Sequence, residues 1–241
     1  MTGVMAAPRN GFREYLADLN RAQKSGAGVP AYTRWVNRRL ARGVAAASAA
    51  LGLTPNAVTM ISAALSAAGL AVLVIVGPTW WTALLTAALL AAGYVFDSAD
   101  GQVARLTGAS SPAGEWLDHV VDAIRTPAIH LTVAVVVVLH RPELAWLAVV
   151  ALLFTVMSVG QFMSQILAEQ LVRNSGGEEA ESNGLRKSLF LLPTDTGVLC
   201  WSFACWIFPP LFAVVYALLF VINFVHTAAS MRRKYRKLTL R

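Results

Sequence analysis

Long, predominantly apolar runs constrain the fold of this chain more than any other feature. A run of about 20 such residues is long enough to cross a bilayer as a helix, and ordinary soluble domains rarely contain several of them. The sequence has 241 residues, of which 56% are hydrophobic and 14% are charged. This length leaves room for about six crossings. We therefore predict an all-α, polytopic membrane protein with one membrane domain.

Proline and glycine pairs divide the apolar sequence into six predicted spans. The predicted spans cover residues 56–77, 80–99, 115–139, 143–172, 191–208 and 211–230. Tight turns are expected at Gly77-Pro78 and Arg141-Pro142, because proline cannot continue a preceding helix. Pro193 and Asp195 interrupt the beginning of the fifth span, which makes it the weakest of the six.

The polar N-terminal part contains two amphipathic segments. Apolar residues recur at helical spacing among charged ones within 12–19 and 35–44, which is typical of helices that lie along a membrane surface. We expect a cytoplasmic N-terminal segment at 1–54, a six-helix transmembrane domain at 55–230 and a basic cytoplasmic tail at 231–241.

The basic residues are distributed as membrane topology requires. The net charge is +7, and Lys and Arg gather before residue 43, after residue 231 and in the polar loops 98–114 and 173–190. Cytoplasmic loops carry such an excess, so both termini and both loops should face the cytoplasm. We expect an integral protein of a bacterial cell membrane. No basic patch is interleaved with aromatic residues, so we expect no nucleic-acid partner.

Four aspartates cluster where the second predicted span ends and the third begins. Asp97 and Asp100 are three residues apart, and Asp118 and Asp122 are four apart, so each pair lies on one face of its helix. The intervening loop allows the two pairs to face each other. Ionisable groups at such positions are costly, and a function is the default hypothesis.

Converging carboxylates repel one another unless cations neutralise them, and hard oxygen ligands select Mg²⁺, Mn²⁺ or Ca²⁺. A site with two such ions can clamp a pyrophosphate and orient an attacking oxygen. A buried salt-bridge network is the alternative, but Arg105 and Arg125 provide too few local cations to balance four acids.

The sequence around these aspartates resembles the signature of the CDP-alcohol phosphotransferase family. The segment from Asp97 to Asp122 follows the pattern D-x2-D-G-x2-A-R-x8-G-x3-D-x3-D at every fixed position. Beyond this motif, the six-helix pattern with an N-terminal surface helix extends the likeness over most of the chain. The resemblance implies an enzyme that cleaves a CDP-linked donor, expels CMP and passes a phosphoalcohol group to the hydroxyl of an acceptor.

The resemblance also implies roles for individual residues. The four aspartates would hold two divalent cations, Mg²⁺ or Mn²⁺, with Asp118 and Asp122 catalytic and Asp122 as the candidate base for the acceptor proton. The residues implied in nucleotide binding are Asn56, Thr59, Gly101, Ala104 and Arg105. For the short segment around Asn56, a plain helix cap made by Thr54 or Asn56 is the alternative. The family likeness further implies a homodimer.

Four residues are candidates for binding the acceptor, and each also has a structural interpretation. Arg125 lies on the same helix face as Asp118 and Asp122, where it could balance these carboxylates or bind an anionic acceptor. Arg186 and Lys187 could instead anchor the topology, and Asp195 could line a polar cavity or cap a helix. The remaining isolated polar residues in the spans are expected to form interhelical hydrogen bonds; they are His119, His130, Gln161, Gln165, Asn223 and His226.

We predict metal-dependent transfer of a phosphatidyl group from a CDP-linked lipid, with CDP-diacylglycerol as the expected donor, to a polar alcohol in phospholipid biosynthesis. The nearest alternative is the reverse arrangement, in which a soluble CDP-alcohol gives its head group to a lipid alcohol. A distant alternative is an ion-coupled transporter, although transporters place such acids near the bilayer midplane rather than at one boundary.

Overall fold

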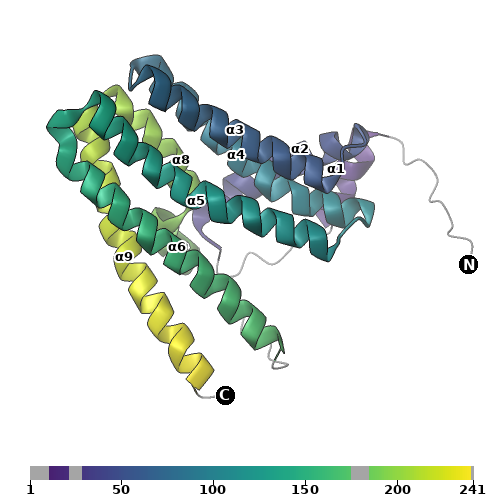
Figure 1. The fold of residues 1–241 in the computed structure, drawn as a ribbon. Helices are drawn as coiled ribbons and strands as arrows, with labels where there is room; N and C mark the ends of the chain where they lie inside the picture. Colours follow the sequence, from purple (N-terminus) through teal and green to yellow (C-terminus); the bar gives the residue numbers. More distant parts are fainter. Residues whose placement is uncertain (1–10, 22–28, 175–184, 240–241) are drawn as a thin grey trace, which may run out of the picture.

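The computed structural model describes residues 11–21, 29–174 and 185–239, and every regular element within them is helical (Figure 1). The helices are α1 (Phe12–Arg21), α2 (Arg38–Ala50), α3 (Pro55–Val76), α4 (Trp80–Thr107), α5 (Pro112–His140), α6 (Ala145–Asn174), α7 (Leu185–Phe190), α8 (Thr196–Ser202) and α9 (Pro209–Thr239). Short 3-10 or π turns are η1 (Thr33–Asn37), η2 (Pro142–Leu144), η3 (Leu192–Thr194) and η4 (Phe203–Ile207). The predicted all-α class is confirmed.

Five of the helices, α3, α4, α5, α6 and α9, are long and apolar enough to cross a membrane. The fifth predicted span, 191–208, instead contains η3 followed by the short apolar helix Thr196–Ile207. Its 7 residues in α8 and 5 in η4 extend about 18 Å at helical rise, against a hydrocarbon core of about 30 Å. Proline in η3 interrupts the helix, so six crossings remain a prediction.

Helices α3 and α4 pack closely because small residues line their contact. The Ser62 hydroxyl donates a hydrogen bond of 2.8 Å to the Gly93 carbonyl, and the Thr86 hydroxyl one of 3.0 Å to the Gly69 carbonyl. A Cβ atom on Gly93 would overlap the Ser66 hydroxyl and lie 3.0 Å from the Ser62 carbonyl oxygen. Glycine is therefore required for this approach of the two backbones.

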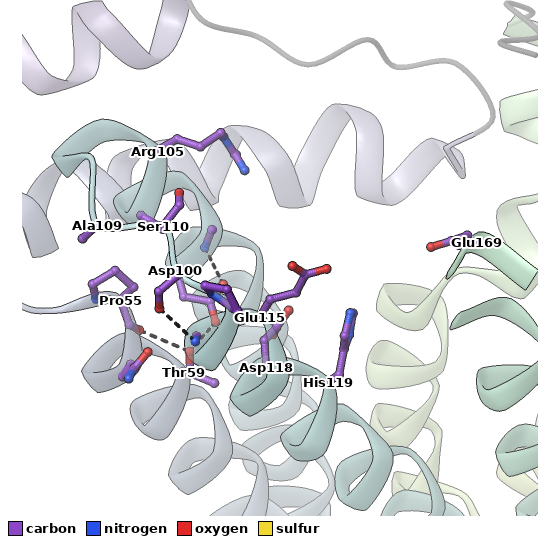
Figure 2. A pocket seen from close by; sticks show the side chains of 16 residues that line it. Pro55, Thr59, Asp100, Arg105, Ala109, Ser110, Glu115, Asp118, His119 and Glu169 are labelled. Atoms are coloured by element: carbon purple, nitrogen blue, oxygen red, sulfur yellow. Dashed lines mark hydrogen bonds between the residues drawn. The ribbon is translucent and has the colours of Figure 1, made fainter. Parts of the chain in front are cut away.

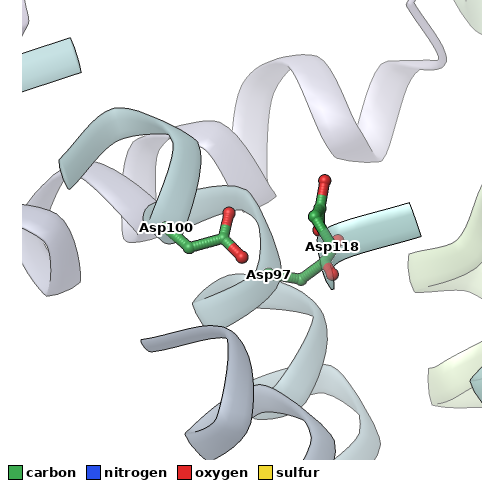
Figure 3. A group of neighbouring side chains, drawn as sticks. All are labelled: Asp97, Asp100 and Asp118. Atoms are coloured by element: carbon green, nitrogen blue, oxygen red, sulfur yellow. The ribbon is translucent and has the colours of Figure 1, made fainter. Parts of the chain in front are cut away.

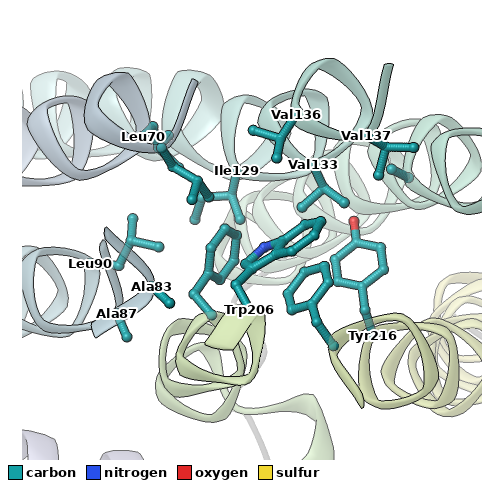
Figure 4. Close-up of a cluster of buried hydrophobic side chains, with 14 of the residues drawn as sticks. Leu70, Ala83, Ala87, Leu90, Ile129, Val133, Val136, Val137, Trp206 and Tyr216 are labelled. Carbon is teal, nitrogen blue, oxygen red and sulfur yellow. The ribbon is translucent and has the colours of Figure 1, made fainter. Parts of the chain in front are cut away.

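One face of the short helix α8–η4 packs against the bundle, where Phe203 and Trp206 complete the core (Figure 4). The rings of Trp206 and Phe212 stack with centroids 4.0 Å apart. Tyr216 of α9 packs on Phe212, and its hydroxyl is 2.7 Å from His130 Nδ1 of α5. The core thus joins α3, α4, α5, η4 and α9, and it holds the buried thiol of Cys200.

The N-terminal helices pack on the end of α4 that carries the first aspartate pair. Helix α1 contacts α2, and α2 contacts α4. Buried alanines of α2, including Ala41 and Ala45, form the contact face, whereas Val36 and Leu40 stay exposed. This exposed apolar side is the one that the sequence assigns to a membrane surface, and that location stays a prediction. At the other end of the chain, α9 continues from the last predicted span into the basic tail.

We predict that Gly93→Ala lowers the free energy of unfolding by about 1–3 kcal/mol, because its methyl group overpacks the α3–α4 contact. Thermal unfolding in detergent measures the effect. Gly43→Ala in α2 is the control, since a Cβ there meets nothing within 4 Å and alanine favours the helix. Equal stability of the two variants would contradict the proposed packing constraint.

Candidate active site

The α4–α5 connection brings the two aspartate pairs together. Helix α4 ends at Gly108, whose φ of 67° is left-handed, and Ser111 caps α5 by accepting a hydrogen bond of 3.1 Å from the Gly114 amide. Glycine suits the left-handed turn, and serine satisfies a free amide of the first helical turn. The chain therefore reverses within a few residues, and the end of α4 faces the beginning of α5.

Three of the four aspartates form a compact group (Figure 3). One carboxylate oxygen from each of Asp97, Asp100 and Asp118 lies within 4.8 Å of the other two. The predicted convergence of the two helices' acids is confirmed for these three. The fourth, Asp122, pairs with Arg125 instead.

Two neighbours fix the orientation of Asp100, whose exposed fraction is 5%. The Thr59 hydroxyl of α3 donates a hydrogen bond of 2.6 Å to Asp100 Oδ2, and the Gly101 amide donates to Oδ1. Both bonds favour the ionised carboxylate. Thr59 was expected to contact the nucleotide, and it also positions this acid.

Arg125 balances part of the negative charge. Its Nη2 atom forms ion pairs with Asp97 Oδ1 and Asp122 Oδ1, and its Nη1 atom donates a hydrogen bond of 2.7 Å to the Ser62 hydroxyl. These contacts support the charge-balancing alternative, and acceptor binding by Arg125 stays a prediction.

The remaining carboxylates fit a divalent cation. Within the described part of the chain, no Lys or Arg forms an ion pair with Asp100 or Asp118. Close carboxylates without such a partner repel each other, and their hard oxygens suit Mg²⁺ or Mn²⁺. The group of three acids can therefore hold a metal ion, and the identity and number of ions stay predictions.

A cavity of about 640 Å³ opens beside this group, lined by residues from α3, α4, α5 and α6 (Figure 2). Asp100 and Asp118 form part of its wall. All the residues predicted to bind the nucleotide also line it, namely Asn56, Thr59, Gly101, Ala104 and Arg105. A Cβ on Gly101 would lie 3.4 Å from Arg105 Nη1, so the glycine leaves room beside this guanidinium. Nucleotide binding stays a prediction, and Thr54 makes the expected cap of α3.

Sequence reasoning missed two acidic residues of this cavity. Glu115 follows Gly114 in the first turn of α5, and Glu169 reaches the cavity from α6. An ionisable residue within the predicted span 143–172 was the available signal for Glu169. His119 also lines the cavity, but it lies outside the group of potential metal ligands.

Asp195 is buried and caps α8, and its predicted role in acceptor binding stays a prediction. Its carboxylate accepts hydrogen bonds from the Thr33 amide at 2.7 Å, the Thr33 hydroxyl at 2.9 Å and the Gly197 amide at 3.0 Å. Asp195 therefore caps α8, which is one of the alternatives given by the sequence, and it also borders a polar cavity. The side chains of Arg186 and Lys187 lie outside the described residues, so their role in acceptor binding stays a prediction.

The segment before α2 also contacts the acid-bearing end of α4. The Thr33 hydroxyl is 2.7 Å from the Tyr94 hydroxyl, and Asn37 Nδ2 donates a hydrogen bond of 2.6 Å to the Ser98 hydroxyl. Tyr94 and Ser98 flank Asp97 in sequence. These bonds connect the N-terminal part to the helix that carries Asp97 and Asp100.

Curated relatives of the chain are vertebrate enzymes. Cholinephosphotransferase 1 of Xenopus laevis is 39% identical over 93 residues, which cover 36% of this chain and 23% of the relative. Cholinephosphotransferase 1 of Mus musculus is 31% identical over 166 residues, covering 64% of this chain and 39% of the relative, and the Rattus norvegicus protein matches to the same extent. The chain therefore spans less than half the length of these relatives. Their eukaryotic origin does not fit the expected bacterial membrane.

A family profile gives broader coverage than the individual relatives. The profile described as CDP-alcohol phosphatidyltransferase matches residues 52–229, well over half of the chain. The match includes all four aspartates and the cavity beside them. The chain belongs to the CDP-alcohol phosphatidyltransferase family, whose members transfer phosphate-containing groups in phospholipid synthesis.

Proposed function

We propose that this protein transfers a phosphoalcohol group from a CDP-linked donor to the hydroxyl of an acceptor and releases CMP. The observation that carries the proposal is the convergence of Asp97, Asp100 and Asp118 at the wall of the 640 Å³ cavity that also contains the nucleotide-binding signature residues. The volume suits a nucleotide, because ligand pockets commonly measure about 300–1,000 Å³.

The aspartates and Arg105 have different roles in the proposed reaction. Mg²⁺ or Mn²⁺ ions held by the aspartates would neutralise the donor's diphosphate and stabilise charge on the leaving CMP. Arg105, exposed at the cavity, supplies a further positive charge to the phosphates. The acceptor oxygen attacks the phosphorus bonded to the donor alcohol, the bond from that phosphorus to CMP breaks, and Asp122 takes the acceptor proton.

The donor is best assigned from the relatives and from the cavity's charge. Proteins named cholinephosphotransferase support a soluble CDP-alcohol as donor and a lipid alcohol as acceptor. The acidic side chain of Glu169 at the cavity suits a cationic head group. We therefore favour this direction over the CDP-diacylglycerol donor expected from the sequence.

The CDP-diacylglycerol donor expected from the sequence is the second candidate, and a largely apolar cavity beside the site suits a lipid in either direction of transfer. This cavity of about 380 Å³ lies between α5 and α6 and includes Trp116, Val120, Ala123 and Ile166. An acyl chain could occupy it whether the lipid is donor or acceptor. Membership of the family argues against the ion-coupled transporter. The homodimer and the cytoplasmic orientation of the site stay predictions.

A donor comparison tests the direction of transfer. Purified protein in Mg²⁺ is given CDP-choline with dioctanoylglycerol, or CDP-diacylglycerol with myo-inositol, and CMP is measured. We expect acceptor-dependent CMP release with the first pair. Release with the second pair alone would reverse the assignment, and the absence of CMP with both would overturn the proposed reaction.

We predict that Asp118→Asn abolishes transfer and weakens metal binding, because it removes a charge from the three-acid group. The measurement is the increase in melting temperature on adding Mn²⁺, which the variant should largely lose. Glu143→Gln is the matched control, since Glu143 is exposed at the α5–α6 turn. A cation-dependent shift of full size in Asp118→Asn would argue against this ligand assignment.

Asp122→Asn tests the proposed base. It should lower kcat by at least about 100-fold, in the range usual for loss of a general base, while part of the Mn²⁺-dependent thermal shift persists through the three-acid group. Steady-state kinetics with saturating donor and acceptor measure the change. A kcat within a factor of a few of the wild-type value would exclude the base role.

A further inference from the structure

The π turn η1 lies at the end of α4 that carries Asp97 and Asp100, and it continues directly into α2. Such turns are rare within helices, and they occur frequently at functional sites. The family signature begins at Asp97 and the family profile at residue 52, so both start after η1. The position of this turn therefore needs an explanation that neither of them gives.

Helix α8 and its cap hold the beginning of η1 in place. The Trp201 indole donates a hydrogen bond of 2.9 Å to the Tyr32 hydroxyl. A Cβ atom on Gly197 would overlap the Tyr32 ring, so this ring packs directly on the backbone of α8. The next residue, Thr33, donates both its amide and its hydroxyl to Asp195. The turn is thus fixed to α8 by side chains on both sides of the contact.

Asn37, at the other end of η1, holds one turn of α4. Its exposed fraction is 0%, and its Nδ2 atom donates hydrogen bonds of 3.2 Å to the Tyr94 carbonyl and 2.6 Å to the Ser98 hydroxyl. These two acceptors are four residues apart, so the amide spans a single helical turn. Asp97 belongs to the same turn and directly precedes Ser98. The side chain of Asn37 therefore holds the backbone that carries one of the three clustered acids.

Packing alone does not explain an asparagine at this place. Its Oδ1 atom is buried and accepts no hydrogen bond from any residue in the described ranges. A buried polar atom without a protein partner is costly to desolvate, and an apolar side chain of the same shape would avoid that cost. The two bonds from Nδ2 to α4 are the property that an apolar residue could not supply.

The affinity of a metal site depends on how narrowly its ligands are held. Asp97 contributes an oxygen to the three-acid group, and Arg125 of α5 contacts its carboxylate. Asn37 acts instead on the α4 turn from which this carboxylate projects. Groups that orient the ligands of a metal commonly change its affinity by 10–100-fold when they are removed.

We propose that Asn37 is a positioning residue for the metal site. By holding the turn 94–98, it sets where Asp97 meets Asp100 and Asp118. The inference rests on the proposed function, because it concerns the cations that this reaction uses. Asn37 acts only through α4, since it lines neither of the cavities that contain the acids.

The test replaces Asn37 with leucine, which has a similar shape and no amide. The Ser98 hydroxyl can then donate to the Tyr94 carbonyl four residues earlier, as serine does within helices. Mn²⁺ alone is the probe, and the melting temperature in detergent is followed against its concentration. We expect Asn37→Leu to need about tenfold more Mn²⁺ for the same increase in melting temperature. Without Mn²⁺ the melting temperature should stay close to the wild-type value, because an unpartnered buried acceptor is removed together with the two bonds.

Ser48→Ala is the matched control. Ser48 is another buried polar residue of α2, and its hydroxyl has no hydrogen bond to the described part of the chain. Its Mn²⁺ titration should match that of the wild type. Ser98→Ala removes the same hydrogen bond from the side of α4 and should also raise the Mn²⁺ requirement. The double variant Asn37→Leu/Ser98→Ala should need no more Mn²⁺ than Asn37→Leu, because both changes remove one interaction.

A purely structural Asn37 would lower the melting temperature without Mn²⁺ and leave the Mn²⁺ titration unchanged. An unchanged titration in either single variant would therefore overturn the inference alone. Effects that multiply in the double variant would also overturn it, since the two residues would then act independently. If Asn37→Leu does not fold, the titration of Ser98→Ala decides. Absence of a Mn²⁺-dependent shift in the wild type would overturn the metal site of the proposed function together with this inference.

Discussion

The two ion pairs of Arg125 are the interaction on which the site depends. Asp97 and Asp122 belong to different helices, and the guanidinium between them, 10% exposed, offsets the repulsion between two partly buried negative charges. Its third contact, to the Ser62 hydroxyl, adds α3 to the pair formed by α4 and α5. Asp100 and Asp118 form no ion pair with Lys or Arg in the described part of the chain, so they can hold a cation together with Asp97, which contacts both Arg125 and this group.

Packing and chemistry are connected through Ser62. The hydroxyl that accepts a bond from Arg125 also donates one to the Gly93 carbonyl, where two backbones approach closely. The absence of a side chain at Gly93 therefore sets the position of a residue that touches the arginine. Small residues in α3 and α4 contribute to tight packing and also to the placement of charge at the site.

Sequence periodicity predicted what is local, and it failed where distant segments meet. The spacing of Asp97 with Asp100 and of Asp118 with Asp122 follows from helix geometry, so their convergence could be predicted. Hydropathy does not decide whether the region after Pro193 crosses the membrane, because a short apolar helix packed in a bundle has the same composition as part of a spanning one, and this crossing stays a prediction. The charge of Glu169 within a predicted span was a signal in the sequence, but its place at the cavity follows from the packing of α6 against α5, which no local pattern encodes.

The hydrogen bonds between Thr33 and Asp195 join the family domain to the part of the chain that precedes it. The family profile begins at residue 52, yet Thr33 precedes it and satisfies a buried carboxylate at the start of α8. A fragment cut to the homologous region would leave that charge without two of its donors, and Tyr94 without its hydroxyl neighbour. The contacts that hold this domain together therefore extend beyond residues 52–229, to at least Thr33.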